Sequence, residues 1–168
     1  MLYLLPLAVV LVAHLSTLAA MVGLSRAYDC DLYLPGGTAF DPQRQNRLLG
    51  WATGCEVLAA LWLVVFVIQR EGVAVPWLAG HIQAATALNF LASAAPVVVP
   101  VLYLLGMLWL VRVGRHLSKF SDLRMTRPDG SVLLPRDLMR PLWLAVNAHG
   151  AMLLIVPPVL LYRSLGQL

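Results

Sequence analysis

The chain has 168 residues, of which 60% are hydrophobic and only 12% are charged. An ordinary soluble domain has about 25% charged residues, so this composition excludes a soluble protein. The net charge of +4 would indicate a nucleic-acid partner in a soluble protein. Here the basic residues flank long uncharged stretches, where they fix orientation and meet anionic lipid headgroups. We therefore expect lipid contacts on the basic side and no nucleic acid.

Four stretches between the charged positions are long enough to cross a bilayer, which takes about 20 apolar residues. They contain one acid or base other than histidine, namely Glu56. The sequence therefore predicts an all-α integral membrane protein, a four-transmembrane-helix bundle that forms a single transmembrane domain over residues 1–168. The predicted spans are residues 2–24, 48–69, 81–112 and 141–162.

The third stretch is too long for one perpendicular helix, because residues 72–111 carry no charge and prolines interrupt them at Pro76, Pro96 and Pro100. We predict a short interfacial lead-in around residues 76–80, followed by one long, tilted helix that kinks near the prolines. Two spans in this stretch are the alternative. They would require a turn near Ser93, where the polar residues that turns prefer are missing.

Two long loops, residues 25–47 and 113–140, separate the predicted spans. The second loop contains Arg127-Pro-Asp-Gly130, a tight-turn sequence. Hydrophobic residues flank this turn on both sides, so a small surface hairpin is expected. They are Leu123, Met125, Val132 and Leu133.

The distribution of lysine and arginine predicts the orientation. With four spans, only Arg70 and Arg163 fall on the side of the termini, and all other basic side chains fall on the side of the two long loops. By the positive-inside rule, both loops face the cytoplasm or the equivalent organellar compartment, and both termini lie on the non-cytoplasmic side. We expect a bacterial inner membrane or an organellar membrane.

The few polar residues inside the predicted spans fall at one depth. A helix rises 1.5 Å per residue, and this places His14, Glu56, Asn147 and His149 within roughly one helical turn of each other. A charge at the centre of a membrane helix costs about 2.5–3.5 kcal/mol on insertion scales, so such a residue normally faces a partner inside the bundle. We therefore predict an intramembrane polar layer built on His14, Glu56 and His149.

Several chemistries fit this layer. His14 and His149 could hold a b-type haem between two helices, and the same histidines with Glu56 could hold a transition metal instead. A glutamate with histidine neighbours could also relay protons. The remaining interpretation is structural, in which a protonated Glu56 bonds to His14, Asn147 or a backbone carbonyl and locks the helices together.

Other features of the sequence are weaker signals. Gly50-x-x-x-Gly54 with alanines around it would allow close approach of another helix. Cys30 and Cys55 form no Cys-x-x-Cys pair, so both are expected to be reduced thiols. His81 and His116 fall near the ends of spans and are expected to be solvated or at headgroup level.

Asp41-Pro-Gln-Arg-Gln-Asn46, followed by Glu56 and Ala60-Leu-Trp62, resembles the membrane-associated eicosanoid and glutathione metabolism proteins. That resemblance implies a trimeric four-helix membrane enzyme with outward amino termini. The family has an arginine, an asparagine and a glutamate at close helical spacing. In this chain Arg44 and Asn46 are closer together, Glu56 lies further along, and no proline follows the glutamate, so no glutathione site is carried over.

The sequence contains no phosphate-binding glycine loop, nucleophile elbow or zinc signature. We therefore expect a non-catalytic accessory subunit that packs against other subunits of a larger membrane complex, respiratory or photosynthetic. The first alternative is an electron- or proton-transfer membrane anchor that uses His14, Glu56 and His149. The second alternative is a small membrane enzyme of the glutathione type.

Overall fold

The computed structural model describes residues 4–28, 32–36, 39–70 and 82–165. Most of these residues form four helices, each with a segment long and apolar enough to cross a membrane. The helices are α1 (Leu4–Tyr28), α2 (Pro42–Arg70), α3 (Ile82–Lys119) and α4 (Pro135–Leu165). The expectation of a helical membrane bundle is thereby confirmed.

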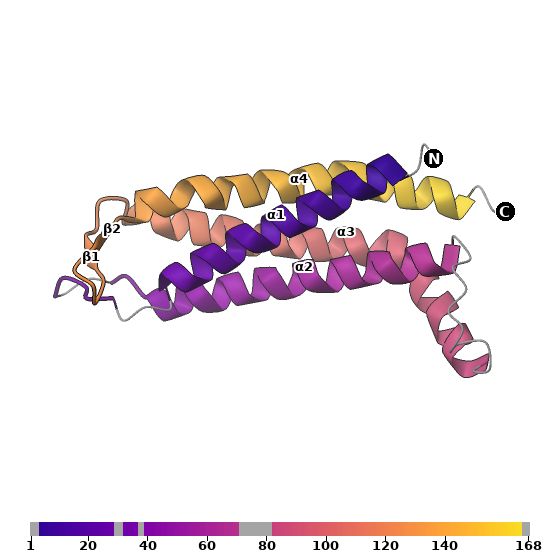
Figure 1. The fold of residues 1–168 in the computed structure, drawn as a ribbon, viewed down its shortest axis with the longest axis horizontal. Helices are drawn as coiled ribbons and strands as arrows, with labels where there is room; N and C mark the ends of the chain where they lie inside the picture. The colour runs from indigo at the N-terminus through magenta and orange to yellow at the C-terminus, as the bar shows by residue number, and fades with distance from the viewer. Residues whose placement is uncertain (1–3, 29–31, 37–38, 71–81, 166–168) are drawn as a thin grey trace.

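The four helices lie side by side, and helices that follow each other in the chain run in opposite directions (Figure 1). Helix α1 packs against α2 and α4, and helix α3 packs against the same two neighbours. Helices α1 and α3 are therefore diagonal to each other, as are α2 and α4. The start of α1 and the end of α4 lie at one end of the bundle, which we call the terminal end. The end of α1, the start of α2 and the segment between α3 and α4 lie at the opposite end, which we call the loop end.

Helix α3 is continuous from Ile82 to Lys119 and contains both Pro96 and Pro100. In residues 82–111, the described part of this stretch, the structure thus has one span and not two. Figure 1 shows the first turns of α3 projecting away from the other helices. The lead-in expected at residues 76–80 lies outside the described residues, and a kink caused by the prolines stays a prediction.

The helices extend beyond the predicted spans at the loop end of the bundle. Helix α2 begins at Pro42, and its first turn is capped by Asp41, whose Oδ1 accepts the N–H of Arg44 at 3.0 Å. Proline suits the first helical position because the N–H that it lacks would have no partner there. Helix α4 also begins at a proline, Pro135. The predicted spans are shorter because hydropathy indicates only the apolar part of a helix. The helix itself continues to the residues that cap it.

The basic loop forms the expected hairpin. Strands β1 (Met125–Thr126) and β2 (Val132–Leu133) pair antiparallel, with Met125 opposite Leu133. In the turn Gly130 has a φ of 81°, a left-handed conformation that glycine adopts without strain, and its N–H donates to the Arg127 carbonyl at 2.9 Å. Tyr33 exchanges two backbone hydrogen bonds with Thr126, which ties the first loop to the hairpin.

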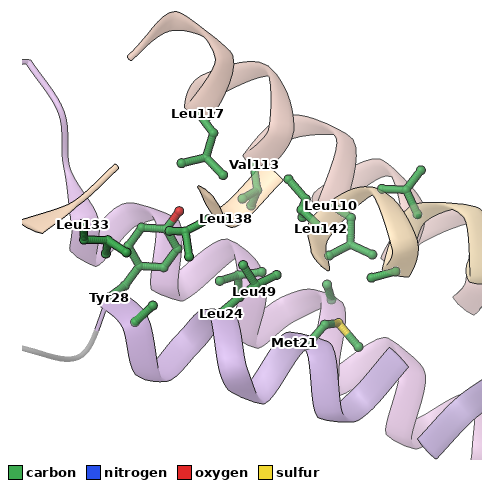
Figure 2. Close-up of a cluster of buried hydrophobic side chains, with 14 of the residues drawn as sticks. Met21, Leu24, Tyr28, Leu49, Leu110, Val113, Leu117, Leu133, Leu138 and Leu142 are labelled. Carbon is green, nitrogen blue, oxygen red and sulfur yellow. The ribbon is translucent and has the colours of Figure 1, made fainter. Parts of the chain in front are cut away.

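The buried apolar side chains form two clusters along the bundle. The cluster at the loop end joins all four helices to the hairpin, and Figure 2 shows its side chains meeting between the ribbons. Its members include Met21, Leu24, Leu49, Leu110, Val113, Leu133 and Leu142. The cluster at the terminal end includes Ala59, Phe66, Val99, Met152 and Val156. In α1, α2 and α4 the polar residues of the predicted layer fall between the two clusters.

Candidate functional site

Four polar side chains, one from each helix, meet where the two apolar clusters adjoin, and one of them, Tyr103, is itself a member of the terminal-end cluster. Glu56 of α2 lies between two histidines, with Oε1 2.7 Å from Nδ1 of His14 and Oε2 2.9 Å from Nε2 of His149. On the far side of His14, Nε2 lies 2.5 Å from the hydroxyl of Tyr103. All four residues are at most 3% exposed. We call this group the polar layer.

Two contacts of the polar layer cross the bundle diagonally. Glu56 and His149 join α2 to α4, and His14 and Tyr103 join α1 to α3. These are the helix pairs that do not pack closely side by side. The polar layer therefore lies on the bundle axis, and it connects all four helices through side chains.

The inward direction of these residues follows from helical spacing. Ala52 and Ala59, which are both fully buried, lie four residues before and three after Glu56. The buried Ala145 and Met152 flank His149 at the same spacings. Residues three and four apart share a face of a helix. Glu56 and His149 therefore lie on the buried face of their helices, where the neighbouring residues are apolar.

Hydrogen-bond chemistry restricts the protons in the polar layer. Nδ1 of His149 lies 3.1 Å from the carbonyl oxygen of Ala145, which can only accept, so Nδ1 carries a proton. Nε2 of His149 and Oε2 of Glu56 form a 2.9 Å ion-pair contact that lacks hydrogen-bond geometry, and one further proton on either atom removes the repulsion between their lone pairs. That proton makes the pair either an imidazolium with a carboxylate or an imidazole with a carboxylic acid.

Both forms of the pair have zero net charge. A neutral His14 completes the layer when its Nδ1–H donates to Glu56 and the Tyr103 hydroxyl donates to its Nε2. Every close contact then holds one proton, and no net charge is buried in the membrane. Since an isolated buried charge is costly, this balance explains how four polar groups are tolerated between two apolar clusters.

Gly106 is the position that lets His149 reach Glu56. It lies three residues after Tyr103 on the buried face of α3. A Cβ atom at this position would lie 2.9 Å from Nε2 and 3.3 Å from Cδ2 of His149. Any larger residue would therefore collide with the imidazole at the nitrogen that faces Glu56.

The structure brings together three of the four residues expected in the layer and leaves Asn147 outside. Asn147 is exposed on the outer face of α4, because it lies two residues from His149 and thus about 200° around the helix. Tyr103 and Gly106 belong to the site but were not assigned to it from the sequence. Their only signal is the three-residue spacing, which places both on one face of a helix.

The two glycines expected to pack helices meet no other helix among the described residues, so their packing role stays a prediction. A Cβ atom at Gly50 or Gly54 would have nothing within 4 Å, and both residues are exposed. Cys55 is a free thiol beside Glu56. Cys30 lies outside the described residues.

The haem and metal interpretations require a free imidazole nitrogen. All four ring nitrogens of His14 and His149 have an oxygen within 3.1 Å, so an axial haem ligand would have to break one of these contacts. Across the described part of the chain, no group of three His, Cys, Asp or Glu residues is arranged to hold a metal ion. The site therefore cannot hold a haem or a metal ion without rearrangement, and both interpretations stay predictions.

Two cavities lie at the loop end. The larger, about 1290 Å³, is lined by residues from the end of α1 to the start of α2, including Tyr28, Phe40 and Arg47. The smaller, about 360 Å³, lies between α2 and α3 and is lined mainly by basic residues. Neither cavity is lined by residues of the polar layer. These two cavities therefore offer no substrate a route to the Glu56 carboxylate.

The arginine, asparagine and glutamate on which the resemblance to glutathione enzymes rests do not form one site in the structure. Arg44 lines the smaller cavity, the Asn46 side chain accepts a hydrogen bond from Ser25, and Glu56 lies in the polar layer. No known family model, curated protein or solved structure matches this chain. What the polar layer does has to follow from its own geometry.

Proposed function

We propose that this chain is an accessory subunit of a larger membrane complex, respiratory or photosynthetic, in a bacterial inner membrane or an organellar membrane. In this proposal the basic loops face the cytoplasm or its organellar equivalent, and the termini face the opposite side. The polar layer is a structural lock that holds the four helices in register, and the outer faces of the helices bind other subunits. The observation that carries the proposal is the position of Asn147.

Asn147 lies near the middle of the apolar segment of α4, which runs from Pro135 to Tyr162. Its side chain is exposed, and the described residues supply it with no hydrogen-bond partner. Lipid tails offer an amide nothing to bond, so polar residues at this depth normally face another helix. The exposed amide of Asn147 therefore supports the proposal of a partner helix that has a polar group at the same depth.

The surface around Asn147 suits such a partner. The neighbouring positions on this face of α4 are exposed and apolar, and one of them is small: Trp143, Leu144, Ala151 and Leu154. A second face with small residues lies on α2, where Gly50 and Gly54 leave the backbone open. Without a hydrophobic force between helices in lipid, small residues and polar contacts are what drive association.

The test is purification of the full chain from its own membranes in mild detergent, with co-purifying chains identified by mass spectrometry. We expect larger membrane partners in fixed stoichiometry. Asn147→Leu should release these partners while the chain keeps its helicity and thermal stability, and Asn147→Gln should retain them. Purification of the wild-type chain without partners, or equal retention by Asn147→Leu, would overturn the proposal.

One observation favours a second candidate, a proton- or electron-transfer anchor. Tyr103, His14, Glu56 and His149 form an unbroken row of titratable groups, with each contact between them at 2.9 Å or less. A row of this kind has the chemistry to pass a proton between neighbouring groups. Glu56→Gln separates the two candidates, because it preserves the contacts of a lock but abolishes the transferable proton of a relay.

A reduced-minus-oxidised absorption spectrum of the chain purified alone tests the haem form of this second candidate. A haem band that disappears in both His14→Ala and His149→Ala would favour the anchor. Co-purifying partners, a featureless spectrum and full complex activity in Glu56→Gln would favour the lock.

A further inference from the structure

We propose that the smaller cavity, between α2 and α3 at the loop end, is a phosphate-binding site that takes the headgroup of an anionic phospholipid in the membrane. The cavity measures about 360 Å³, within the usual 300–1,000 Å³ of ligand pockets. Its polar lining consists of Arg44 and Gln45 from α2 and Arg112, Arg115, His116 and Lys119 from α3. None of the described residues that line it is acidic.

The four cations around this cavity have no ion-pair partner, although Asp41, whose charge acts on His116 and whose Oδ1 accepts the Arg44 N–H, lies nearby. Within the described parts of the chain, no carboxylate oxygen lies within ion-pairing distance of Arg44, Arg112, Arg115 or Lys119. All four side chains are exposed. Four like charges around one cavity repel each other unless an anion lies between them, and a phosphate group accepts both the charge and the paired N–H groups of arginine.

Two polar side chains in the cavity wall also lack partners. Gln45 is fully buried, yet neither its amide nitrogen nor its amide oxygen has a hydrogen-bond partner among the described residues. Nε2 of His116 is buried and equally unpartnered, while the imidazole stacks on Phe40 with 5.6 Å between ring centroids. Buried amides are nearly always bonded, so an amide left open beside four cations indicates a missing anionic acceptor.

The place of the cavity along the bundle favours a lipid over a dissolved anion. It lies at the ends of the membrane-spanning segments of α2 and α3, where phospholipid headgroups lie. The Arg112 guanidinium lies 4.8 Å from the ring of Trp109, an aromatic residue of the kind that anchors helices at the interface. One and two turns deeper on this face, Leu108 and Leu105 are exposed and can contact the acyl chains. Basic pockets between membrane helices bind such headgroups.

The experiment uses the full chain in mild non-ionic detergent at low ionic strength. Binding of three probes is measured by native mass spectrometry and thermal shift: short-chain phosphatidate, phosphatidylcholine with the same chains, and inorganic phosphate. We expect one saturable site for phosphatidate, with phosphatidylcholine and inorganic phosphate bound more weakly. Equal binding of phosphatidate and inorganic phosphate would support a phosphate-binding site but would overturn the lipid as its ligand in favour of free phosphate. Absence of binding by both would overturn the proposal.

Variants locate the site. Arg44→Gln combined with Arg115→Gln should weaken phosphatidate binding by at least about tenfold, since each removes a charged hydrogen-bond donor. Arg124→Gln combined with Arg140→Gln, which removes two exposed arginines at the same end but outside the cavity, is the matched control. Circular dichroism confirms that each variant is folded. An equal loss in the control variant would show that only the overall charge matters and would overturn the site.

Gln45→Leu separates binding from packing. The leucine removes an unpartnered buried amide, so the empty protein should unfold at the same temperature or higher. If the amide bonds the phosphate, the same variant should bind phosphatidate more weakly. Unchanged binding in Gln45→Leu would contradict the role of this residue.

Discussion

The Glu56 carboxylate contacts His149 across the diagonal of the bundle, with 2.9 Å between Oε2 and Nε2. The other nitrogen of this imidazole donates its proton to the Ala145 carbonyl, so one proton is shared between Glu56 and His149. Glutamine can reproduce this arrangement, because its NH₂ group donates to Nε2 of His149 while its oxygen accepts from Nδ1 of His14.

From this geometry, we expect Glu56→Gln to fold and to lose less than about 1 kcal/mol of unfolding free energy. Glu56→Leu removes the shared partner of both histidines, and breaking a buried pair in this way costs about 3–5 kcal/mol. Equilibrium unfolding in mixed detergent micelles measures both variants. Similar losses in the two variants would contradict the proton assignment.

The hairpin turn should respond to acid. Hydrogen bonds from the Ser131 hydroxyl and N–H hold the pKa of the exposed Asp129 below its ordinary value, with the N–H 2.8 Å from Oδ1. A lowered pKa in the folded state means that the carboxylate supports the turn above about pH 3.9 and that this support is lost as pH falls through the lowered pKa. The Ser131 amide resonance should titrate accordingly in an NMR pH series.

Asp129→Asn is the control for this turn. The asparagine side-chain oxygen still accepts the Ser131 N–H but does not titrate. Its spectrum should therefore show no acid transition at Ser131. A transition that persists in the variant would show that another group causes it.

The depth of the polar layer could be predicted from sequence, but the directions of its side chains could not. Counting residues along each span places His14, Glu56 and His149 at one level, and their burial follows from the cost of a charge in lipid. The same count includes Asn147, which has the right depth but the wrong face of α4. Because every span is apolar all round, hydropathy does not show which face points inward.

Tyr103 and the basic cavity were missed for a related reason. A single tyrosine in an apolar span is equally compatible with a core position, and only the diagonal pairing of α1 and α3 brings it to His14. Likewise, Arg44 and Arg115 are far apart in the chain, and only the packing of α2 on α3 gathers them around one cavity. Element lengths and turn residues are local properties, whereas both sites depend on which helices are neighbours.

Tyr103→Phe tests the contact between the Tyr103 hydroxyl and His14 in the polar layer. Removing the hydroxyl leaves Nε2 of His14 without a partner in a buried position, which should cost about 1–3 kcal/mol of unfolding free energy. Tyr33→Phe is the matched control, because Tyr33 is 68% exposed and its contacts with Thr126 are made by the backbone. A loss in Tyr103→Phe no greater than in the control would show that the hydroxyl does not hold His14.

Gly106→Ala tests whether the close approach of α3 to His149 positions the shared proton. Alanine normally stabilises a helix by about 0.5–1 kcal/mol relative to glycine. Here the added Cβ would lie 2.9 Å from Nε2 of His149, so the imidazole has to move away from Glu56. We expect a net destabilisation, together with a shifted imidazole ¹⁵N resonance for His149.

Gly54→Ala provides the comparison, because a Cβ atom there meets nothing within 4 Å. That variant should be neutral or slightly more stable when the chain is purified alone, and its His149 resonances should be unchanged. The opposite signs expected at two glycines of the same bundle separate the steric effect on His149 from the general effect of alanine on a helix. A stabilised Gly106→Ala with an unshifted imidazole would show that the bundle has room at this point, and that the contact between Glu56 and His149 does not depend on the glycine.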